Sequence, residues 1–189
     1  SGIDLDKINS IRAKKESLTA LYAGRLIDYK NVDVLIKSFA NIKKDIPDAR
    51  LKIIGTGPEK SALTNLSDEL GVDAEFLGFV SEEEKIKHMK SATVLINPSS
   101  VEGLGLILLE SMACGTPVIA KKLPTYFFCN RKNSILVEND NYSKAIAEIF
   151  NKKTKRKGME KAGLKTASKY SWDETAKKVE NVYFEWMRR

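Results

Sequence analysis

The segment that most narrowly limits the fold is residues 93–115, where two apolar runs are separated by a short polar loop. The first run, residues 93–97, reads Thr-Val-Leu-Ile-Asn and stops at a proline, which predicts a buried strand. Glu102 and Glu110 then bracket a Gly-Leu-Gly-Leu-Ile-Leu-Leu run, and a Cys-Gly pair follows as a helix stop. In open α/β sheets, ligands bind beyond the carboxyl ends of the strands. Glu102 is therefore expected at the rim of a crevice, with Glu110 on the helix that leaves it.

The same alternation of strand and helix patterns extends over most of the chain. Apolar runs predict about six strands, and periodic apolar residues or capping signals such as Ser81 with Glu84 predict helices between them. This order predicts a Rossmann-like α/β fold, in which helices cover both faces of a mostly parallel sheet in three layers. The predicted strands are 18–23, 50–54, 74–77, 93–97, 116–120 and 134–137, and the helices after the last strand are about 141–151, 154–168 and from 171 onward.

The two ends of the chain differ from this central body, which we assign to residues 17–170. Residues 1–16 show little apolar periodicity and are predicted to be a lead-in or inter-domain linker. Residues 171–189 are predicted to form a helix with one apolar stripe, which packs either on this domain or on a second domain outside the chain. The residues of the stripe are Trp172, Ala176, Val179, Tyr183 and Trp186.

Composition narrows the class of protein. With 189 residues, 42% hydrophobic and 30% charged, the chain is typical of one globular domain, and no apolar run reaches the length of roughly 18 residues that spans a bilayer. Cys114 and Cys129 lack metal-ligand spacing, which favours free thiols in a reducing cytoplasm. No cluster of metal ligands and no serine, histidine and acid set for acyl transfer is visible, so no metal site is expected.

The formal net charge is +7, and the basic residues include a dense run at residues 152–157. One interpretation is a solvated helix face and loop. The other is attraction to anionic lipid or to a phosphorylated substrate, which would place the protein peripherally at the membrane surface. Nucleic acid is not an expected partner, because no aromatic residues interleave with the basic ones and no nucleic-acid-binding motif is present.

Candidate ligand-binding residues follow the first two predicted strands. Arg25 and Lys30 lie after the first strand, where they can hold a phosphate or remain plain surface cations. Gly55-Thr-Gly57 follows the second strand, but Lys60 stands where a dinucleotide fingerprint has its third glycine. These glycines are more simply explained by a tight turn and close approach of a ligand.

The segment after the fourth strand suits a phosphate-bearing ligand, because backbone N–H groups at a helix start favour a pyrophosphate. If residues 102–110 were helical throughout, eight positions would separate the two glutamates by about 12 Å. That span fits two parts of an extended ligand. It exceeds the roughly 5 to 9.5 Å between the carboxyl groups of glycoside hydrolases, which argues against that class.

Together, these motifs resemble the C-terminal half of retaining group 1 (family 4) glycosyltransferases, which have the GT-B fold. The resemblance covers nearly the whole chain, and Ser1 to about Arg12 resembles the linker between the two halves of such enzymes. The matching segments, in chain order, are residues 22–26 with Lys30, 48–59, 76–80, 98–99, 102–118 and 171–172.

The resemblance implies a nucleotide-diphosphate-sugar donor, retention at the anomeric carbon and no tightly bound cofactor. It further implies a missing N-terminal domain that supplies the acceptor site, with a lipid-linked or glycan acceptor; the chain alone would bind donor weakly and transfer nothing. The catalytic residues would be Arg25 and Lys30, on the diphosphate and leaving group, and Glu102, on the transferred sugar. Donor-binding residues would be Glu110 on the ribose, Gly78, Phe79 and Val80 at the base, Gly103, Leu104, Gly105 and Leu106 along the sugar and phosphate, and Gly24 and Gly57.

Two departures from the family pattern keep other functions open. Leu104 replaces the usual phenylalanine, and residues 121–128 lack the family's Gly-Gly pair and its Pro-Glu, with Thr125 in place of the glutamate. A non-catalytic module that binds a nucleotide or sugar phosphate is therefore the first alternative. A nicotinamide-binding oxidoreductase domain is the second, which the incomplete glycine pattern disfavours.

Overall fold

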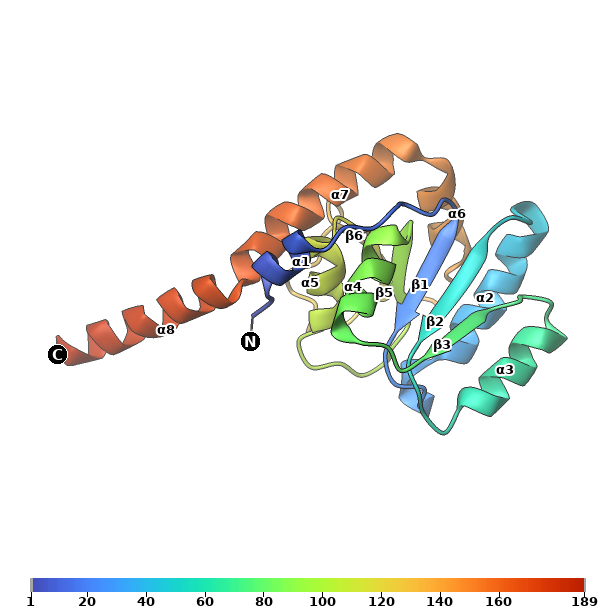
Figure 1. Ribbon diagram of the computed structural model, residues 1–189, viewed down its shortest axis with the longest axis horizontal. Helices are drawn as coiled ribbons and strands as arrows, with labels where there is room; N and C mark the ends of the chain where they lie inside the picture. Colours follow the sequence, from blue (N-terminus) through green and yellow to red (C-terminus); the bar gives the residue numbers. More distant parts are fainter. Residues whose placement is uncertain (1, 189) are drawn as a thin grey trace.

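The computed structural model describes residues 2–188 and shows a three-layer α/β/α domain (Figure 1). Its six-stranded sheet has the order β3-β2-β1-β4-β5-β6, and every neighbouring pair is parallel. The predicted Rossmann-like class is confirmed. The strands are β1 Thr19–Ala23, β2 Arg50–Ile54, β3 Glu75–Gly78, β4 Val94–Asn97, β5 Val118–Lys121 and β6 Ser134–Val137.

Eight α-helices and two short 3-10 helices connect and flank the strands in the described part of the chain. The strand order reverses between β1 and β4, and such a switch point opens a crevice at the carboxyl ends of the strands. The helices are α1 Leu5–Ser10, α2 Val32–Asp45, α3 Lys60–Glu69, α4 Glu82–Ser91, α5 Leu106–Ala113, α6 Ser143–Asn151, α7 Lys153–Ala167 and α8 Trp172–Met187, with η1 Asp28–Lys30 and η2 Ser168–Tyr170.

The central strands are buried on both faces, which explains their unbroken apolar runs. In β1, Ala20 and Tyr22 pack into one core with α2 and α6, whereas Leu21 packs into the other with α4 and α5. Residues 94 to 97 of β4 are all buried. These central strands therefore hold the loops that follow them in fixed positions.

The N-terminal segment is packed on the domain. Ile3, Ile8 and Ile11 are all buried in the core that contains α4 and α5. Ile3 also forms a parallel bridge with Ser171, and its N–H donates to Tyr170 O at 2.9 Å. A short helix, α1, thus lies inside the segment that the sequence predicted to be a lead-in. Ser1, at its outer end, lies outside the described residues.

Helix α8 extends away from the rest of the molecule (Figure 1). Ser171 begins it as expected, with its side chain accepting a hydrogen bond from the N–H of Glu174, but none of its described residues is buried. The interpretation that its apolar stripe packs on this domain is wrong. Packing on a second domain stays a prediction, and Arg189 lies outside the described residues. The exposed large apolar residues here are Trp172, Val179, Val182, Tyr183, Phe184, Trp186 and Met187.

Two further sequence expectations concern the cysteines and membrane-spanning helices. Cys114 and Cys129 are both free thiols, and burial raises their pKa to about 12 and about 11. Within residues 2–188, no helix combines the length and apolar character needed to cross a bilayer.

Candidate functional site

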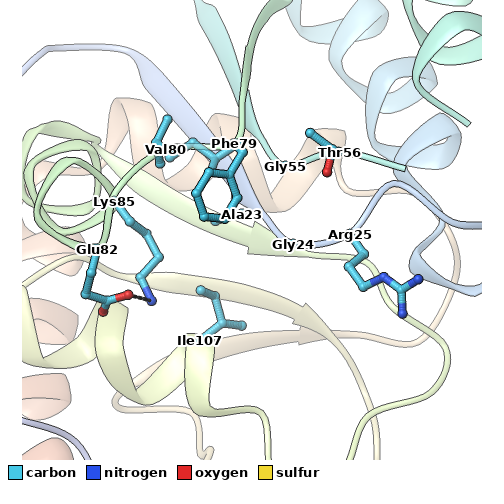
Figure 2. A pocket seen from close by; sticks show the side chains of 11 residues that line it. Ala23, Gly24, Arg25, Gly55, Thr56, Phe79, Val80, Glu82, Lys85 and Ile107 are labelled. Carbon is cyan, nitrogen blue, oxygen red and sulfur yellow. Dashed lines mark ion pairs between the residues drawn. The ribbon is translucent and has the colours of Figure 1, made fainter. Parts of the chain in front are cut away.

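A cavity of about 470 Å³ opens at the carboxyl ends of β1, β2 and β3 (Figure 2). Phe79 and Ile107 face each other across it, with Arg25 on one side and Lys85 with Glu82 on the other. The middle of the cavity is therefore apolar and its two sides are charged. It is lined by Ala23, Gly24, Arg25, Ile54, Gly55, Thr56, Phe79, Val80, Glu82, Lys85 and Ile107.

Arg25 and Phe79 are exposed side chains of this cavity, as are Thr56 and Glu82. Phe79 is 88% exposed, although it follows directly on β3, whose end is fixed by the sheet. Arg25 is also exposed, and the loop that carries it is fixed by the Tyr22 hydroxyl, which donates to Arg25 O at 2.9 Å. The aromatic ring and the guanidinium group thus face the cavity from backbone segments that the sheet and a hydrogen bond restrain.

Glu110 is held at the other side of the cavity through Lys85. Lys85 Nζ lies 2.7 Å from Glu110 Oε2 and 3.0 Å from Glu82 Oε2. Burial by itself lowers the pKa of Lys85, but the two carboxylates outweigh it, so that the pKa lies above its usual range. The lysine stays charged at neutral pH. The pair engages Oε2 of Glu110, which leaves Oε1 to accept a hydrogen bond.

Glu110 does not itself line this cavity. It lines a neighbouring one of about 260 Å³, which also includes Glu82 and residues 2–4 of the N-terminal segment. The carboxylate thus lies between the two cavities, and Lys85 connects it to the larger one.

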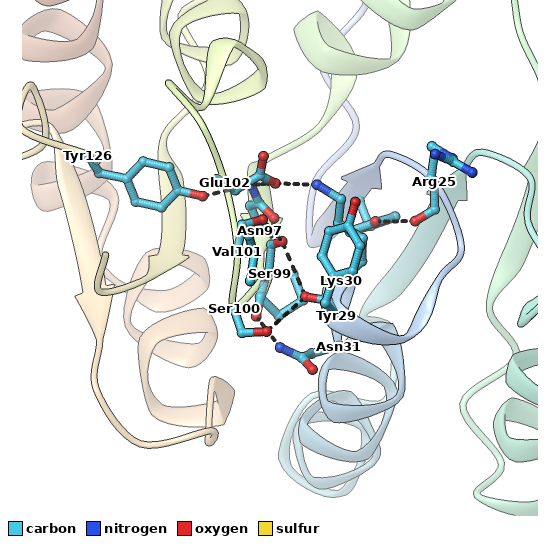
Figure 3. Close-up of polar contacts among 12 residues, drawn as sticks. Arg25, Tyr29, Lys30, Asn31, Asn97, Ser99, Ser100, Val101, Glu102 and Tyr126 are labelled. Carbon is cyan, nitrogen blue, oxygen red and sulfur yellow. Dashed lines mark hydrogen bonds and ion pairs between the residues drawn. The ribbon is translucent and has the colours of Figure 1, made fainter. Parts of the chain in front are cut away.

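Glu102 lies on the loop before α5 and is held by two other segments (Figure 3). Lys30 Nζ is 2.6 Å from Glu102 Oε1, and Asn97 Nδ2 donates to the same oxygen at 3.2 Å. Asn97 Nδ2 also donates to the Tyr126 hydroxyl at 3.2 Å. Burial, and then the negative charge of Glu102, raise the pKa of Tyr126, which therefore stays protonated at neutral pH.

The loops after β1 and β4 are bonded to each other. The backbone carbonyl of Tyr29 accepts from Ser100 N at 2.9 Å and from Ser99 Oγ at 3.3 Å, and Asn31 Nδ2 donates to Pro98 O at 3.0 Å. These bonds fix the geometry of the Lys30–Glu102 pair, since each partner belongs to one of the two loops (Figure 3).

Glycine is required at three positions near the site, for different structural reasons. Gly105 has a φ of 74°, and a Cβ atom there would lie 2.5 Å from Tyr126 Cε1. At Gly55 and Gly57, a Cβ atom would overlap the backbone carbonyl oxygens of Gly24 and Leu26, respectively. The close approach expected from the Gly-Thr-Gly pattern is therefore made by the protein's own chain, and a contact of Gly57 with ligand stays a prediction.

The structure brings together only part of the predicted site. Four predicted residues line the main cavity: Gly24, Arg25, Phe79 and Val80. Lys30 and Glu102 meet each other outside that lining, and the helical path assumed between the two glutamates is absent because α5 begins at Leu106. The other predicted residues, namely Gly57, Gly78, Gly103, Leu104, Gly105, Leu106 and Glu110, are not among the lining residues of this cavity.

Several residues of the site were not predicted from the sequence, among them Lys85, Asn97 and Tyr126. Asn97 carried a usable signal, because a polar residue ends an otherwise apolar strand at the edge where ligands bind. The capping box at Ser81 fixes where α4 begins, but gives no partner for Lys85. Tyr126 belongs to the divergent segment 121–128, so this segment supplies a residue beside Glu102.

Comparison with known proteins identifies the family. The family model for glycosyl transferases group 1 matches residues 5–166. The chain belongs to the group 1 glycosyltransferases. An uncharacterized glycosyltransferase of Methanocaldococcus jannaschii is 32% identical, with 94% of this chain and 48% of the relative covered. A D-inositol 3-phosphate glycosyltransferase of Corynebacterium aurimucosum is 29% identical, with 86% of this chain and 42% of the relative covered.

Solved structures agree with this assignment. The catalytic domain of the cholesterol-α-glucosyltransferase of Helicobacter pylori has a TM-score of 0.72 and 28% identity, and 81% of this chain and 98% of that one are covered. Anabaena HepE in complex with UDP and glucose has a TM-score of 0.82 at 18% identity, with 97% of this chain and 55% of that one covered, and shows the shared fold. The glycosyltransferase chain described here thus spans about half the length of the curated relatives named above.

Proposed function

We propose that this chain is the donor-binding half of a glycosyltransferase that moves a sugar from a nucleotide diphosphate to an acceptor with retention at the anomeric carbon. The observation that carries the proposal is the cavity beyond β1, β2 and β3. Its centre is apolar, and charged side chains lie at both of its sides, with Arg25 at one and Lys85 and Glu82 at the other. A nucleoside diphosphate suits such a cavity, because its flat base matches the apolar centre and its negatively charged diphosphate matches the Arg25 side.

The nucleoside part is assigned to the side of the cavity that contains Phe79 and Lys85. The Phe79 ring and the Ile107 side chain offer apolar walls for a base, and Val80 lines the same cavity. Glu110 Oε1 accepts from a ribose hydroxyl while Oε2 remains on Lys85. In this assignment the Glu110 carboxylate turns toward the main cavity.

The diphosphate is assigned to Arg25, whose exposed guanidinium group is positioned to form two parallel hydrogen bonds with a phosphate. Lys30 is paired with Glu102, so it contributes to the leaving group by shifting part of its contact from carboxylate to phosphate. The Glu102 carboxylate then contacts hydroxyl groups of the sugar. The backbone N–H groups from Gly103 to Leu106, at the start of α5, line the sugar and the phosphate.

The acceptor and the rest of the catalytic cleft are assigned to an N-terminal domain outside this chain, because the chain covers only about half of its relatives. A lipid-linked or glycan acceptor fits this assignment. The exposed apolar stripe of α8 provides a surface on which such a domain would pack. Cytoplasmic location and the absence of a tightly bound cofactor complete the proposal.

Calorimetric titration of the chain with UDP, GDP, ADP and NAD tests the proposal. We expect weak binding of one nucleoside diphosphate and weaker binding of NAD. A preference for NAD would favour an oxidoreductase domain and refute the glycosyltransferase reading of the site. UDP is the first probe to use, because Anabaena HepE is described in complex with UDP and glucose.

Activity assays separate catalysis from binding. The chain alone is expected to transfer no sugar, and sugar transfer by the purified chain would refute the assignment of the acceptor site to another domain. The longer protein is expected to transfer sugar. Donor binding without transfer by the longer protein would instead favour a non-catalytic binding module, the alternative raised by the divergent segment 121–128.

A further inference from the structure

Helix α7 carries a row of four exposed lysines that the donor site does not use. They recur at every fourth position, so successive members lie on adjacent turns and the row winds around the helix by about 40° per step. Over this spacing the row is about 18 Å long. We call these residues the lysine row: Lys153, Lys157, Lys161 and Lys165.

The charges of the lysine row are not neutralised by the protein. Among residues 2–188, no carboxylate lies within ion-pair distance of any of the four. Their basic neighbours behave differently, since Lys152 and Lys155 both contact Glu148 at 2.9 Å. The one acidic residue of α7, Glu160, lies 3.9 Å from Arg156. The row therefore presents four uncompensated positive charges to the solvent.

Packing of the opposite face fixes the direction of the row. Met159, Gly163 and Ala167 are the buried residues of α7, and Gly163 lies against Met112 of α5. These positions lie across the helix from the middle of the lysine row, so the row is turned mainly to solvent, and Lys157 also lines a surface cavity with Lys15 and Glu160. In Figure 1, α7 is an outer helix of the molecule.

Further positive charge lies beside the C-terminal half of the row. Asn133 Nδ2 donates to Thr166 Oγ1 at 2.9 Å, which holds the loop of residues 130–133 against α7. Arg131 and Lys132 of this loop are both exposed. The cationic surface is thus built from two segments on a rigid support.

We propose that the lysine row is a docking surface for an anionic membrane. The charges are complementary, because an unpaired cationic row on one side of a helix suits an anionic bilayer surface, where each lysine strengthens partitioning by roughly fivefold. Leu164, which is 47% exposed next to Lys165, adds an apolar contact at the interface. RNA is disfavoured as the occupant, because α7 has no aromatic residue on which a base would stack.

Docking through α7 leaves the donor cavity free. The lining of that cavity comes from the loops after β1, β2 and β3 and from α4 and α5, and no residue of α7 belongs to it. Membrane association and nucleotide binding are therefore separable. Removal of charge from the lysine row should leave nucleotide affinity unchanged.

The test is co-sedimentation of the chain with vesicles at about 0.1 M salt, where surface charge still acts over roughly 10 Å. Vesicles of phosphatidylcholine with about a third of phosphatidylglycerol are compared with pure phosphatidylcholine. The account expects binding only to the anionic vesicles, and loss of that binding by a hundredfold or more when all four lysines of the row are changed to glutamine. Equal binding to both kinds of vesicle, or to neither, would overturn the proposal.

A matched control removes the same charge elsewhere. Its four changes to glutamine are at exposed basic residues distant in sequence from α7: Arg12, Lys14, Lys44 and Lys60. The control is expected to lose only a few-fold in vesicle binding, from the smaller net charge. Equal loss in both variants would show that total charge, not the row, is responsible, and would overturn the proposal.

Two further measurements keep the result interpretable. Unchanged nucleotide affinity and circular dichroism of the quadruple variant confirm its fold, and two double variants replace it if it unfolds. Binding of single-stranded RNA that depends on the lysine row, without vesicle binding, would contradict the membrane proposal and identify nucleic acid as the partner.

Discussion

Glu102 lies on a loop and Glu110 on a helix, yet each carboxylate is paired with a lysine through only one of its oxygens. Glu102 receives Lys30 and Asn97 on Oε1, and the loops that carry these residues are bonded to each other. Glu110 receives Lys85 on Oε2, and Lys85 also contacts Glu82. Each carboxylate thus keeps one oxygen for a ligand, but the Glu102 side is fixed by several loops and the Glu110 side by two helices.

This difference gives the two acids different expected roles. A group held by several loops at the end of the central strands can be placed accurately relative to a reacting sugar, which favours a role in the transition state. A group on a helix at the nucleoside side contributes to ground-state binding of the donor. Variants on the two sides of the site should separate these roles.

The largest effect is expected for Glu102→Gln in the longer enzyme. The change keeps the shape of the side chain but removes the charge that Lys30 pairs with, so turnover should fall about a hundredfold or more while donor affinity changes little. Steady-state kinetics with direct donor titration separates the two quantities. A loss confined to the KM for donor would assign Glu102 to binding alone.

Gly105→Ala tests how far the Glu102 side depends on backbone geometry. The new Cβ atom would lie 2.5 Å from Tyr126 Cε1, at a residue with a φ of 74°. We expect a loss of about 2 kcal/mol in the free energy of unfolding. Gly103→Ala is the matched control, since nothing lies within 4 Å of its added atom, and it should change stability by less than about 0.5 kcal/mol. Equal free energies of unfolding for the two variants in urea titration would contradict the view that the Tyr126 ring requires glycine at position 105.

Glu110→Gln should weaken nucleoside diphosphate binding about tenfold and leave the turnover of donor-saturated enzyme nearly unchanged. The reason is that the charged acceptor for a ribose hydroxyl is lost, whereas the Lys30–Glu102 side is untouched. Calorimetry of the chain measures the affinity. The 2′-deoxy nucleotide serves as the control ligand. The ribose contact is supported if the parent protein binds the 2′-deoxy nucleotide about tenfold more weakly than the ordinary nucleotide, while the variant binds both equally. A variant that still prefers the ordinary nucleotide would contradict the contact.

The smallest effect is expected for Lys85→Met, with about threefold weaker nucleotide binding, because Glu110 loses its orienting partner but keeps its charge. The pKa of Lys85 is raised, so the pair is fully formed below the usual lysine value and is lost only as pH rises through the higher folded value. Nucleotide affinity should therefore depend on Lys85 equally at all pH values between about 6 and 9. A difference between variant and parent that vanished within that range would contradict the assignment.

The fold was predictable because the sheet is buried on both faces. The strands at residues 50–54 and 134–137 match β2 and β6, since continuous apolar runs bounded by turns leave little freedom in their ends. The capping box of Ser81 and Glu84 likewise fixed the start of α4. Helix α1 was missed because it has six residues and little periodicity, and its burial depends on tertiary packing.

The site was less predictable, because its contacts join segments far apart in the sequence. Arg25, predicted from the rule that ligand sites follow parallel strands, and Phe79, predicted from the family resemblance, both line the cavity, and their contacts with a ligand stay predictions. The partners Lys85 and Tyr126 require knowledge of which helices and loops become neighbours, which no local pattern contains. Similarly, the apolar stripe of α8 predicted a helix, but amphipathicity does not say on which body it packs.

The central claim is that a donor nucleotide binds across the cavity between Arg25 and Lys85. The most direct measurement is titration of the isotope-labelled chain with UDP, GDP and ADP while the backbone amide NMR signals are followed. The account predicts that one diphosphate shifts a single group of signals, at Gly24, Arg25, Phe79, Val80 and Glu110. Shifts confined to other surfaces, such as α7 or the N-terminal segment, or no shift with any of the three nucleotides, would contradict it.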